Sequence, residues 1–429
     1  MRRLAMAMAM AFILPGFAEA GDGRGVMLQW YKLVLELVRH TPTYSPPVAS
    51  RAFAYLGVTG YEVMASGRPE MVSLSGQLNE LGPVPKQGSG AYDEGVVMQA
   101  AMAQSIRNFF GNTGPSGQQA MNRMEDLLAK EVTAGLPDEV VKRSDAFGRS
   151  LAQHIWLWSQ SDGGAVVENM GFPEHFVPSQ EPGHWKPTST IDLQQTPLLP
   201  NWGKNRPFAM PAGTSCHLPP PPAYSEDPQS EFYKQAMEVY DTTRALTDEQ
   251  ETIARFWSDD PMLSSTPPGH WIALVLTLVE MDRMDGPRTA DALMRVGVGV
   301  ADAFIGCWAE KFKYDYIRPV TFIRSKIDPA WEPLLITPPF PEYPSGHSSQ
   351  SGAAATVLTA IFGENHAFGD PTHEEDGIQT RMFGSFWEAA EEAAMSRLYG
   401  GIHFRAAVEL GLEQGRCIGA YAVKLRTLN

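Results

Sequence analysis

Apolar residues recur at intervals of three and four positions along most of the chain, the spacing that gathers them on one face of an α-helix. The alternation of apolar and polar residues that is typical of a half-buried strand is nearly absent. The pattern predicts helices over residues 27–39, 46–66, 91–110, 118–131, 138–159, 228–244, 247–257, 271–285, 289–313, 348–362, 384–399 and 405–428. Thr247 and Gln250 are spaced for a capping box at one helix start. We therefore expect an all-α fold built around a helical bundle.

The stretch of residues 163–230 breaks this pattern. It is rich in proline, glycine, serine and asparagine, and it contains the run Leu218-Pro219-Pro220-Pro221-Pro222. Two short runs within it, 188–193 and 205–210, favour extended backbone. A long irregular segment inside a compact domain is often functional. We expect a single domain over residues 21–429, with N-terminal helices at about 27–160, this irregular segment, and a helical core at about 231–429 that carries the chemistry.

The first 20 residues have the features of a secretory signal peptide. Arg2 and Arg3 form a positive start, residues 4–17 are mostly apolar, and Ala18-Glu19-Ala20 has the small-x-small form of a cleavage site. The apolar stretch is too short for an ordinary membrane-spanning helix, and no later run holds 18 uninterrupted apolar residues. The sequence predicts an exported protein, periplasmic or secreted, with no membrane span in the mature chain.

Composition narrows the classes of partner. With 429 residues and 43% hydrophobic content, the chain can bury a large core. Its formal charge of -15 makes nucleic acid an unsuitable partner, so a bound anion needs local basic residues. The three cysteines are an odd number at wide spacing, which does not predict a disulfide framework or a zinc site. Cys307 and Cys417 lie in apolar helical contexts and are expected to be small buried residues.

Pro344-Ser345-Gly346-His347 opens an apolar, alanine-rich run that is predicted to be helical. The start of a helix has unpaired N–H groups and a partial positive charge, so it favours an anion. Gly346 lets the backbone approach a ligand, Ser345 adds a hydroxyl, and His347 is a candidate general acid or base. The alternative is an ordinary serine N-cap followed by an exposed histidine.

Basic residues flank this turn on both sides. Lys311 and Arg318 are seven positions apart, so on one helix they share a face, and Pro319 is expected to end or bend that helix. Downstream, Arg397 offers a planar fork of donors that suits a phosphate-like oxyanion, and His403 is a candidate nucleophile or metal ligand. The alternatives are a solvated basic face for the first pair and a capping or core role for His403.

The three blocks resemble, in content and order, the superfamily that joins vanadium-dependent haloperoxidases and type 2 phosphatidic acid phosphatases. They are Lys311-x6-Arg318-Pro319, Pro344-Ser345-Gly346-His347 and Ser396-Arg397-x5-His403. The clear resemblance covers about residues 300–420. Less specifically, Ser45-Pro46-Pro47 and Thr266-Pro267-Pro268-Gly269-His270-Trp271 look like the bacterial haloperoxidase branch. The resemblance implies a helical bundle around one oxyanion site.

The resemblance also implies a role for each residue of the three blocks. The oxygens of vanadate, or of phosphate in the same place, would be held by Lys311, Arg318, Ser345, Gly346 and Arg397. His403 would bond the vanadium or attack phosphorus, and His347 would be the acid–base residue; with Lys311 and Arg397 they form the expected catalytic set. Trp308 and Phe340 match positions where fungal chloroperoxidases have aromatic residues near the proposed halide site, and core packing is their alternative role.

One position departs from the family pattern. The family usually has an aspartate four residues after the ligand histidine, where this chain has Ala407. Glu409 faces another side of the predicted helix and is a poor substitute. Losing a carboxylate that orients a ligand histidine typically costs about 10–100-fold in affinity or activity. Another acid or a backbone carbonyl could take over this role.

Three functions therefore stay open. The first is a vanadate-dependent haloperoxidase that oxidises halide with hydrogen peroxide. The second is a soluble exported phosphatase that uses His403 as its nucleophile on a phosphate ester, and the third is a non-catalytic oxyanion-binding protein. Each has small-molecule partners. Of the other histidines, His270 is expected to be structural or to approach the site, and His373 is expected in a loop or at the surface.

Overall fold

The computed structural model describes residues 22–168, 170, 172, 175–189, 195–260 and 262–428. The predicted signal peptide at residues 1–20 lies outside the described residues, as does most of the predicted extended run 188–193. The helices are α1 (Gly23–Arg39), α2 (Pro46–Gly67), α3 (Glu94–Phe109), α4 (Pro115–Val132), α5 (Asp138–Ser159), α6 (Glu231–Arg244), α7 (Asp248–Phe256), α8 (Thr266–Met281), α9 (Gly286–Tyr314), α10 (Pro319–Lys326), α11 (Gly346–Phe362), α12 (Phe386–Tyr399) and α13 (Arg405–Val423).

This element order confirms the all-α class. The described residues also form a 3-10 turn, η2 (Trp202–Lys204), and one small antiparallel hairpin of β1 (Phe368–Asp370) and β2 (Arg381–Phe383). Helix starts follow local capping chemistry: Thr247 and Gln250 form the predicted capping box of α7. Helix α8 begins at Thr266, five residues before the predicted start, because its proline pair fits the first turn.

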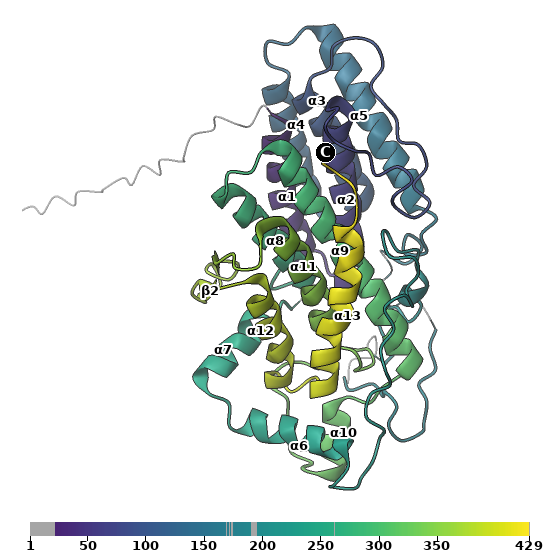
Figure 1. Cartoon of the computed structure of the whole chain (residues 1–429), viewed down its shortest axis with the longest axis vertical. Helices are drawn as coiled ribbons and strands as arrows, with labels where there is room; N and C mark the ends of the chain where they lie inside the picture. Colours follow the sequence, from purple (N-terminus) through teal and green to yellow (C-terminus); the bar gives the residue numbers. More distant parts are fainter. Residues whose placement is uncertain are drawn as a thin grey trace, which may run out of the picture.

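Helix α9 is the structural centre of the molecule. It packs against α2, α8, α11 and α13. In Figure 1, α1–α5 gather at one end of an elongated molecule, α11–α13 lie in the middle, and α6 and α10 lie at the other end. Among the described residues, α9 is the one helix long and apolar enough to cross a membrane, and 89% of its apolar window is buried inside the protein. Its composition is therefore that of a core helix.

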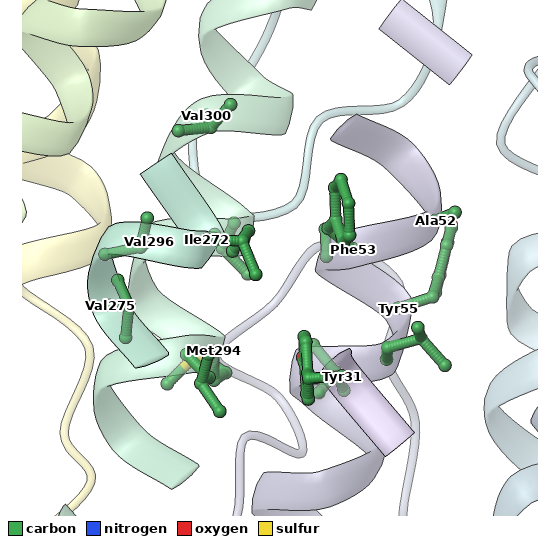
Figure 2. Close-up of a cluster of buried hydrophobic side chains, with 14 of the residues drawn as sticks. Tyr31, Ala52, Phe53, Tyr55, Ile272, Val275, Met294, Val296 and Val300 are labelled. Carbon is green, nitrogen blue, oxygen red and sulfur yellow. The ribbon is translucent and has the colours of Figure 1, made fainter. Parts of the chain in front are cut away.

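The main core joins the N-terminal helices to α8 and α9. Tyr31 of α1 and Phe53 of α2 lie close to Ile272 of α8 and Met294 of α9, and all four are at most 1% exposed (Figure 2). The α2–α9 contact needs a glycine, because a Cβ added at Gly57 would lie only 2.8 Å from the Cα of Met294. This packing fixes α9, whose last turn carries Lys311.

The connection between Lys311 and Arg318 differs from the prediction. Helix α9 ends at Tyr314, and Asp315 takes a left-handed conformation with φ 45°, so the two basic residues do not share a helix face. The chain leaves the helix because residues 315–317 pair with the irregular segment: Trp185 N donates to the Asp315 carbonyl at 2.8 Å. Pro319 then occupies the first turn of α10, a helix that the sequence pattern did not predict.

Three further predictions are wrong. Residues 205–210 form no strand, because they follow the η2 turn and bend across the buried Asp302 carboxylate, which accepts from their backbone N–H groups. Cys216 and Cys417 form a disulfide that ties the irregular segment to α13. Their separation of 201 residues hid the pair, since only the folded chain brings their Cα atoms to 6.0 Å. Cys307 is free and buried, as predicted, whereas Cys417, which was also predicted to be buried, is exposed.

Candidate active site

The three sequence blocks come together where five helices begin or end. Lys311 lies in the last turn of α9, Arg318 caps the start of α10, and Ser345 caps the start of α11. Arg397 lies in the last turn of α12, and His403 precedes α13. These five side chains are at most 2% exposed, whereas Gly346 and His347 are partly exposed. The predicted set therefore forms one site, and its solvent-facing side is the first turn of α11.

Close packing of α11 against α13 sets the position of the turn. The Ser345 N–H donates to the Ala407 carbonyl at 3.0 Å, and the Ser345 hydroxyl accepts from Ser348 N at 3.3 Å. A Cβ added at Gly415 would lie 2.2 Å from the Ser349 carbonyl oxygen, so only glycine allows this approach. The start of α11 is thereby held beside the start of α13, next to His403.

His403 is held by a carboxylate that the sequence analysis did not identify. Its Nδ1 lies 2.9 Å from Oε1 of Glu342, which also accepts from the Phe404 N–H at 2.8 Å. Its Nε2 lies 3.2 Å from Nη1 of Arg318. With the ring proton on Nδ1 and donated to Glu342, the Nε2 lone pair faces the basic side of the site. Glu342 thus fixes both the ring orientation and the tautomer that a metal ligand needs.

Glu342 supplies the carboxylate that is missing at Ala407, where the family usually has an aspartate. Ala407 is fully buried in an apolar cluster, and the carboxylate that orients His403 comes instead from the loop before α11. Glu409 pairs with Arg405, so it is not the substitute. One signal was present in the sequence: Glu342 is the single charged residue in the run Pro338-Pro339-Phe340-Pro341-Glu342-Tyr343-Pro344. Burial raises the pKa of Glu342 to about 7, against the opposing effect of Arg318 and Lys311.

Lys311 stabilises the loop that carries Glu342. Its Nζ donates to the Pro341 carbonyl at 2.8 Å, to the Glu342 carbonyl at 3.0 Å, and to the Pro344 carbonyl. These three bonds use all three of its donors. Complete burial lowers the pKa of Lys311 to about 7, so neutral and charged forms coexist near neutral pH. The protonation state of Lys311 therefore affects both the charge of the site and the hydrogen bonds that hold the loop carrying Glu342.

The two arginines are fixed by backbone carbonyls. Arg318 donates from Nε to Phe340 at 3.0 Å and from Nη1 to Ile402 at 2.7 Å, while its buried Nη2 has no partner among the described residues. Arg397 donates from Nη2 to the Trp257 carbonyl at 2.6 Å. Burial lowers the pKa of each arginine to about 10, so both stay charged at neutral pH. An unpaired guanidinium N–H inside a protein is costly unless a ligand meets it.

His347 is neutral and has an available nitrogen. Its Nε2 is buried without a partner among the described residues. Burial, followed by the charge of Arg397, places the pKa of His347 well below its usual value. His403 has a similarly depressed pKa because of burial and the nearby charges of Arg318 and Lys311. Two neutral imidazoles therefore lie among fixed positive charges, and each has a nitrogen that can accept a bond.

The comparisons with known proteins agree with this arrangement. Residues 291–428 match a family model described as the VCPO second helical-bundle domain. A solved structure of a bacterial vanadium-dependent iodoperoxidase is 37% identical, with a TM-score of 0.86, over 95% of this chain and 97% of that one. The chain belongs to the vanadium-dependent haloperoxidase family.

More distant haloperoxidases match in part. The vanadium chloroperoxidase of Curvularia inaequalis is 28% identical over 161 residues, 26% of each chain. The vanadium-dependent bromoperoxidase of Ascophyllum nodosum is 35% identical over 94 residues, 19% of this chain and 17% of that one. The matches thus span about a quarter or less of these curated relatives. A bacterial vanadium-dependent chloroperoxidase structure at 16% identity and a TM-score of 0.67 shares the fold.

The site of this haloperoxidase family member fits an oxyanion such as vanadate. Three basic side chains, Lys311, Arg318 and Arg397, lie buried with the single carboxyl group of Glu342. The negative charges of Asp259 and Asp260 also act on Arg397. The positive charge at the centre exceeds the negative charge next to it. Such an excess is costly in a buried site and is relieved by a bound anion. The unpartnered Arg318 Nη2 is a donor that such an anion can use, and the unpartnered His347 Nε2 lies at the same site.

Trp308 and Phe340 form an aromatic wall beside these cations. Their ring centroids are 5.0 Å apart, and the Lys311 Nζ lies 5.1 Å from the Phe340 centroid. A Cβ added at Gly346 would lie 3.7 Å from the Trp308 ring. Trp308 is buried and donates to the Leu198 carbonyl at 3.1 Å, so the irregular segment also reaches this wall. Both aromatic positions therefore border the predicted oxyanion site.

A second histidine cluster lies behind Arg397. His270 is 1% exposed, with Nδ1 2.9 Å from Asp259 and Nε2 2.9 Å from Asp370, so it has the structural role that was one of its two expectations. His373 lies in the loop after β1, which was one of its two expectations, but it is 6% exposed and so does not lie at the surface. It was missed because the hairpin at β1 folds its loop back onto α8, a contact that local sequence does not encode.

Proposed function

We propose that this protein is a vanadate-dependent haloperoxidase, which oxidises halide with hydrogen peroxide at the site formed by Lys311, Arg318, His347, Arg397 and His403. The observation that carries the proposal is that an unpartnered arginine donor and the unpartnered Nε2 of a neutral His347 lie buried at the same site as the oriented, neutral His403. Arg318 Nη2 and His347 Nε2 have no partner among the described residues, and Glu342 holds Nδ1 of His403. In a purely structural cluster, buried polar groups are normally hydrogen-bonded to other protein groups.

Each residue has a task that follows from its surroundings. His403 would bond vanadium through Nε2, while Arg318, Arg397, Ser345 and the Gly346 N–H would hold the vanadate oxygens. Lys311 would reach the anion by exchanging one of its three carbonyl partners. Bound vanadate supplies Lewis-acid activation of peroxide toward halide. His347 would accept a proton from the incoming peroxide at Nε2, which its depressed pKa leaves free to act as a base.

The aromatic wall of Trp308 and Phe340 is the proposed halide position. It borders Lys311 and Gly346, so a halide there would lie next to the oxyanion. A relative that is 37% identical over 95% of this chain is an iodoperoxidase, which favours iodide as the first halide to test. We also propose that the protein is exported, periplasmic or secreted, because a disulfide joins Cys216 and Cys417 and such bonds persist in oxidising compartments.

A direct assay tests the function. The mature protein is loaded with orthovanadate, dialysed, and assayed for peroxide-dependent oxidation of iodide, bromide and chloride, with monochlorodimedone as the halogen acceptor. Hydrolysis of p-nitrophenyl phosphate is measured without vanadate. We expect halide oxidation that depends on added vanadate. Phosphate-ester hydrolysis without any halide oxidation would instead favour the phosphatase alternative, in which His403 is phosphorylated.

Removal of the ligand histidine gives the matched variant. His403→Ala should reduce retained vanadium from about one per chain to a trace, because no other group supplies the bond to the metal. His40→Ala, at a histidine whose side chain is 63% exposed, is the control and should retain vanadium normally. Equal retention by His403→Ala and the wild type would show that the ligand is misassigned.

A further inference from the structure

A separate group of metal-ligating side chains lies behind the oxyanion site. Asp259 follows α7, His270 lies in α8, and His373 follows β1; all three are buried, and one ligand atom from each lies within 4.8 Å of the others. The two oxygens of Asp259 are 3.1 and 2.9 Å from Nδ1 of His270. Oδ1 of Asp259 is 3.2 Å from Nε2 of His373. The three residues come from distant segments and meet at one point.

The far nitrogen of each histidine is held by its own carboxylate. Nε2 of His270 lies 2.9 Å from Asp370, and Nδ1 of His373 lies 2.8 Å from Asp376. In metal sites, the nitrogen that does not bind the ion typically donates to a carboxylate, which fixes the ring and its tautomer. Both rings here have this arrangement, with the opposite nitrogens turned toward Asp259.

Aromatic rings and a constrained backbone surround the cluster. The Trp257 ring stacks on His270 with centroids 4.5 Å apart, and Phe256 contacts both histidine rings edge-on at 5.3 Å. Asp259 is held at φ 46°, a left-handed conformation that costs free energy and persists only where the surrounding structure fixes it. An aromatic shell and a constrained ligand backbone are features of a preorganised site.

We propose that Asp259, His270 and His373 bind one divalent transition-metal ion, and that Zn²⁺ is the ion this donor set fits. Two histidines and one carboxylate are a known zinc ligand combination. Bonds of about 2.0–2.2 Å at tetrahedral angles put neighbouring ligand atoms roughly 3.3 Å apart, close to the 2.9–3.2 Å found between Asp259 and the two rings.

The charge of the cluster agrees with a bound cation. Asp259, Asp370 and Asp376 face two imidazoles, while Arg39 reaches Asp376 at 3.2 Å and the charge of Arg397 acts on Asp259. A divalent ion between neutral imidazoles supplies the same positive charge as two added protons. The ion would fix the segment that carries Trp257, whose carbonyl accepts from Arg397, so it would support the oxyanion site from behind.

Metal content tests this proposal independently of haloperoxidase activity. The tag-free mature protein is stripped with a chelator, dialysed against Zn²⁺ or Co²⁺, loaded with orthovanadate, dialysed again, and analysed by elemental mass spectrometry for metal and vanadium together. We expect one Zn²⁺ or Co²⁺ per chain, with visible Co²⁺ absorption bands typical of a four-coordinate site. His403→Ala should lose vanadium and keep zinc, which separates the two sites. No stoichiometric Zn²⁺ or Co²⁺ in the wild type would overturn the proposal.

Variants then locate the ion. His270→Gln and His373→Gln should each lose it, whereas His366→Gln, at a histidine that also faces an aspartate, should keep it. Asp376→Asn is a milder variant at a partly exposed side chain, and about 10–100-fold weaker Zn²⁺ binding is expected. Unchanged affinity in a folded His270→Gln or Asp376→Asn protein would place the ion elsewhere and overturn the assignment.

Discussion

Two buried histidines, His403 and His270, make the same first contact and have opposite properties. Each is at most 2% exposed, and each has Nδ1 2.9 Å from a buried carboxylate, Glu342 or Asp259. Burial and the nearby cations lower the pKa of His403 well below its usual value. Although burial also lowers the pKa of His270, Asp259 and Asp370 raise it to about 10.

The difference lies at the second ring nitrogen. Nε2 of His403 faces the Arg318 guanidinium at 3.2 Å, whereas Nε2 of His270 faces the Asp370 carboxylate at 2.9 Å. In the metal-free protein, the same histidine–carboxylate pair is therefore neutral in one place and carries a positive charge in the other. The charges around the pair, and not the pair itself, decide whether the ring is protonated before any ion binds.

The largest expected effect comes from breaking the second pair. His270→Gln in chelator-treated protein leaves Asp259 and Asp370 buried without their cation, and we expect a loss of about 3–5 kcal/mol in the free energy of unfolding. Chemical denaturation at pH 6 measures it. The exposed His40→Gln variant is the control, and a loss no larger than the control's would contradict the assigned charge of His270.

The same variant has a pH signature. The folded-state pKa of His270, about 10, lies above the usual 6.5, so its stabilisation is complete below about pH 6.5 and is lost as the pH rises toward 10. The gap in stability between the wild type and His270→Gln should therefore narrow between pH 6.5 and 10. A constant gap across that range would show that protonation is not the source of the effect.

The next effect concerns the carboxylate of His403. Glu342→Gln keeps the shape but removes the charge that orients Nδ1, and we expect about 10–100-fold weaker retention of vanadate. Equilibrium dialysis with vanadate measures it. Adding Ala407→Asp to this variant returns a carboxylate one helical turn after His403 and should recover part of the affinity.

The single variant Ala407→Asp is the matched control. In the presence of Glu342 it should give no gain, because Nδ1 of His403 already has its partner. Wild-type retention in Glu342→Gln, or a gain in Ala407→Asp alone, would show that Glu342 does not perform the task of the family's aspartate. Comparing the two single variants with the double variant thus separates the effect of ring orientation on vanadate affinity from a general loss of stability.

Most of the helices, α10 excepted, and the residues of the three blocks that meet at the site were predictable from sequence, because both depend on local order. Apolar spacing gives the helices, and three short blocks name Lys311, Arg318, Arg397 and the two histidines. The partners of these residues were not predictable. Glu342 reaches His403 across 61 positions, and Cys216 reaches Cys417 across 201, so both contacts exist only after packing.

The backbone conformation between the sequence blocks could not be predicted from local sequence either. The seven-residue spacing of Lys311 and Arg318 suits one helix, yet Asp315 takes a left-handed turn because the following residues pair with the irregular segment. His373 entered the buried cluster in the same way, because the hairpin that carries it contacts α8, which is distant in sequence. Local pattern identified the chemistry, and tertiary contacts decided protonation and orientation.

The smallest expected effect is a pH slope that originates at Lys311, one of the cations that keep His403 neutral. Its pKa of about 7 in the anion-free protein means that it loses its charge as the pH rises above 7, while a bound oxyanion favours the charged form. Affinity for vanadate should therefore fall by at most about tenfold per pH unit above pH 7.

Lys311→Arg keeps its charge throughout and is the comparison, because the ionisation of vanadate and of Glu342 is common to both proteins. The slope of the wild type should exceed that of Lys311→Arg between pH 7 and 9 in equilibrium dialysis, and equal slopes would mean that the lysine stays charged, with its three carbonyl partners in place, at every pH tested.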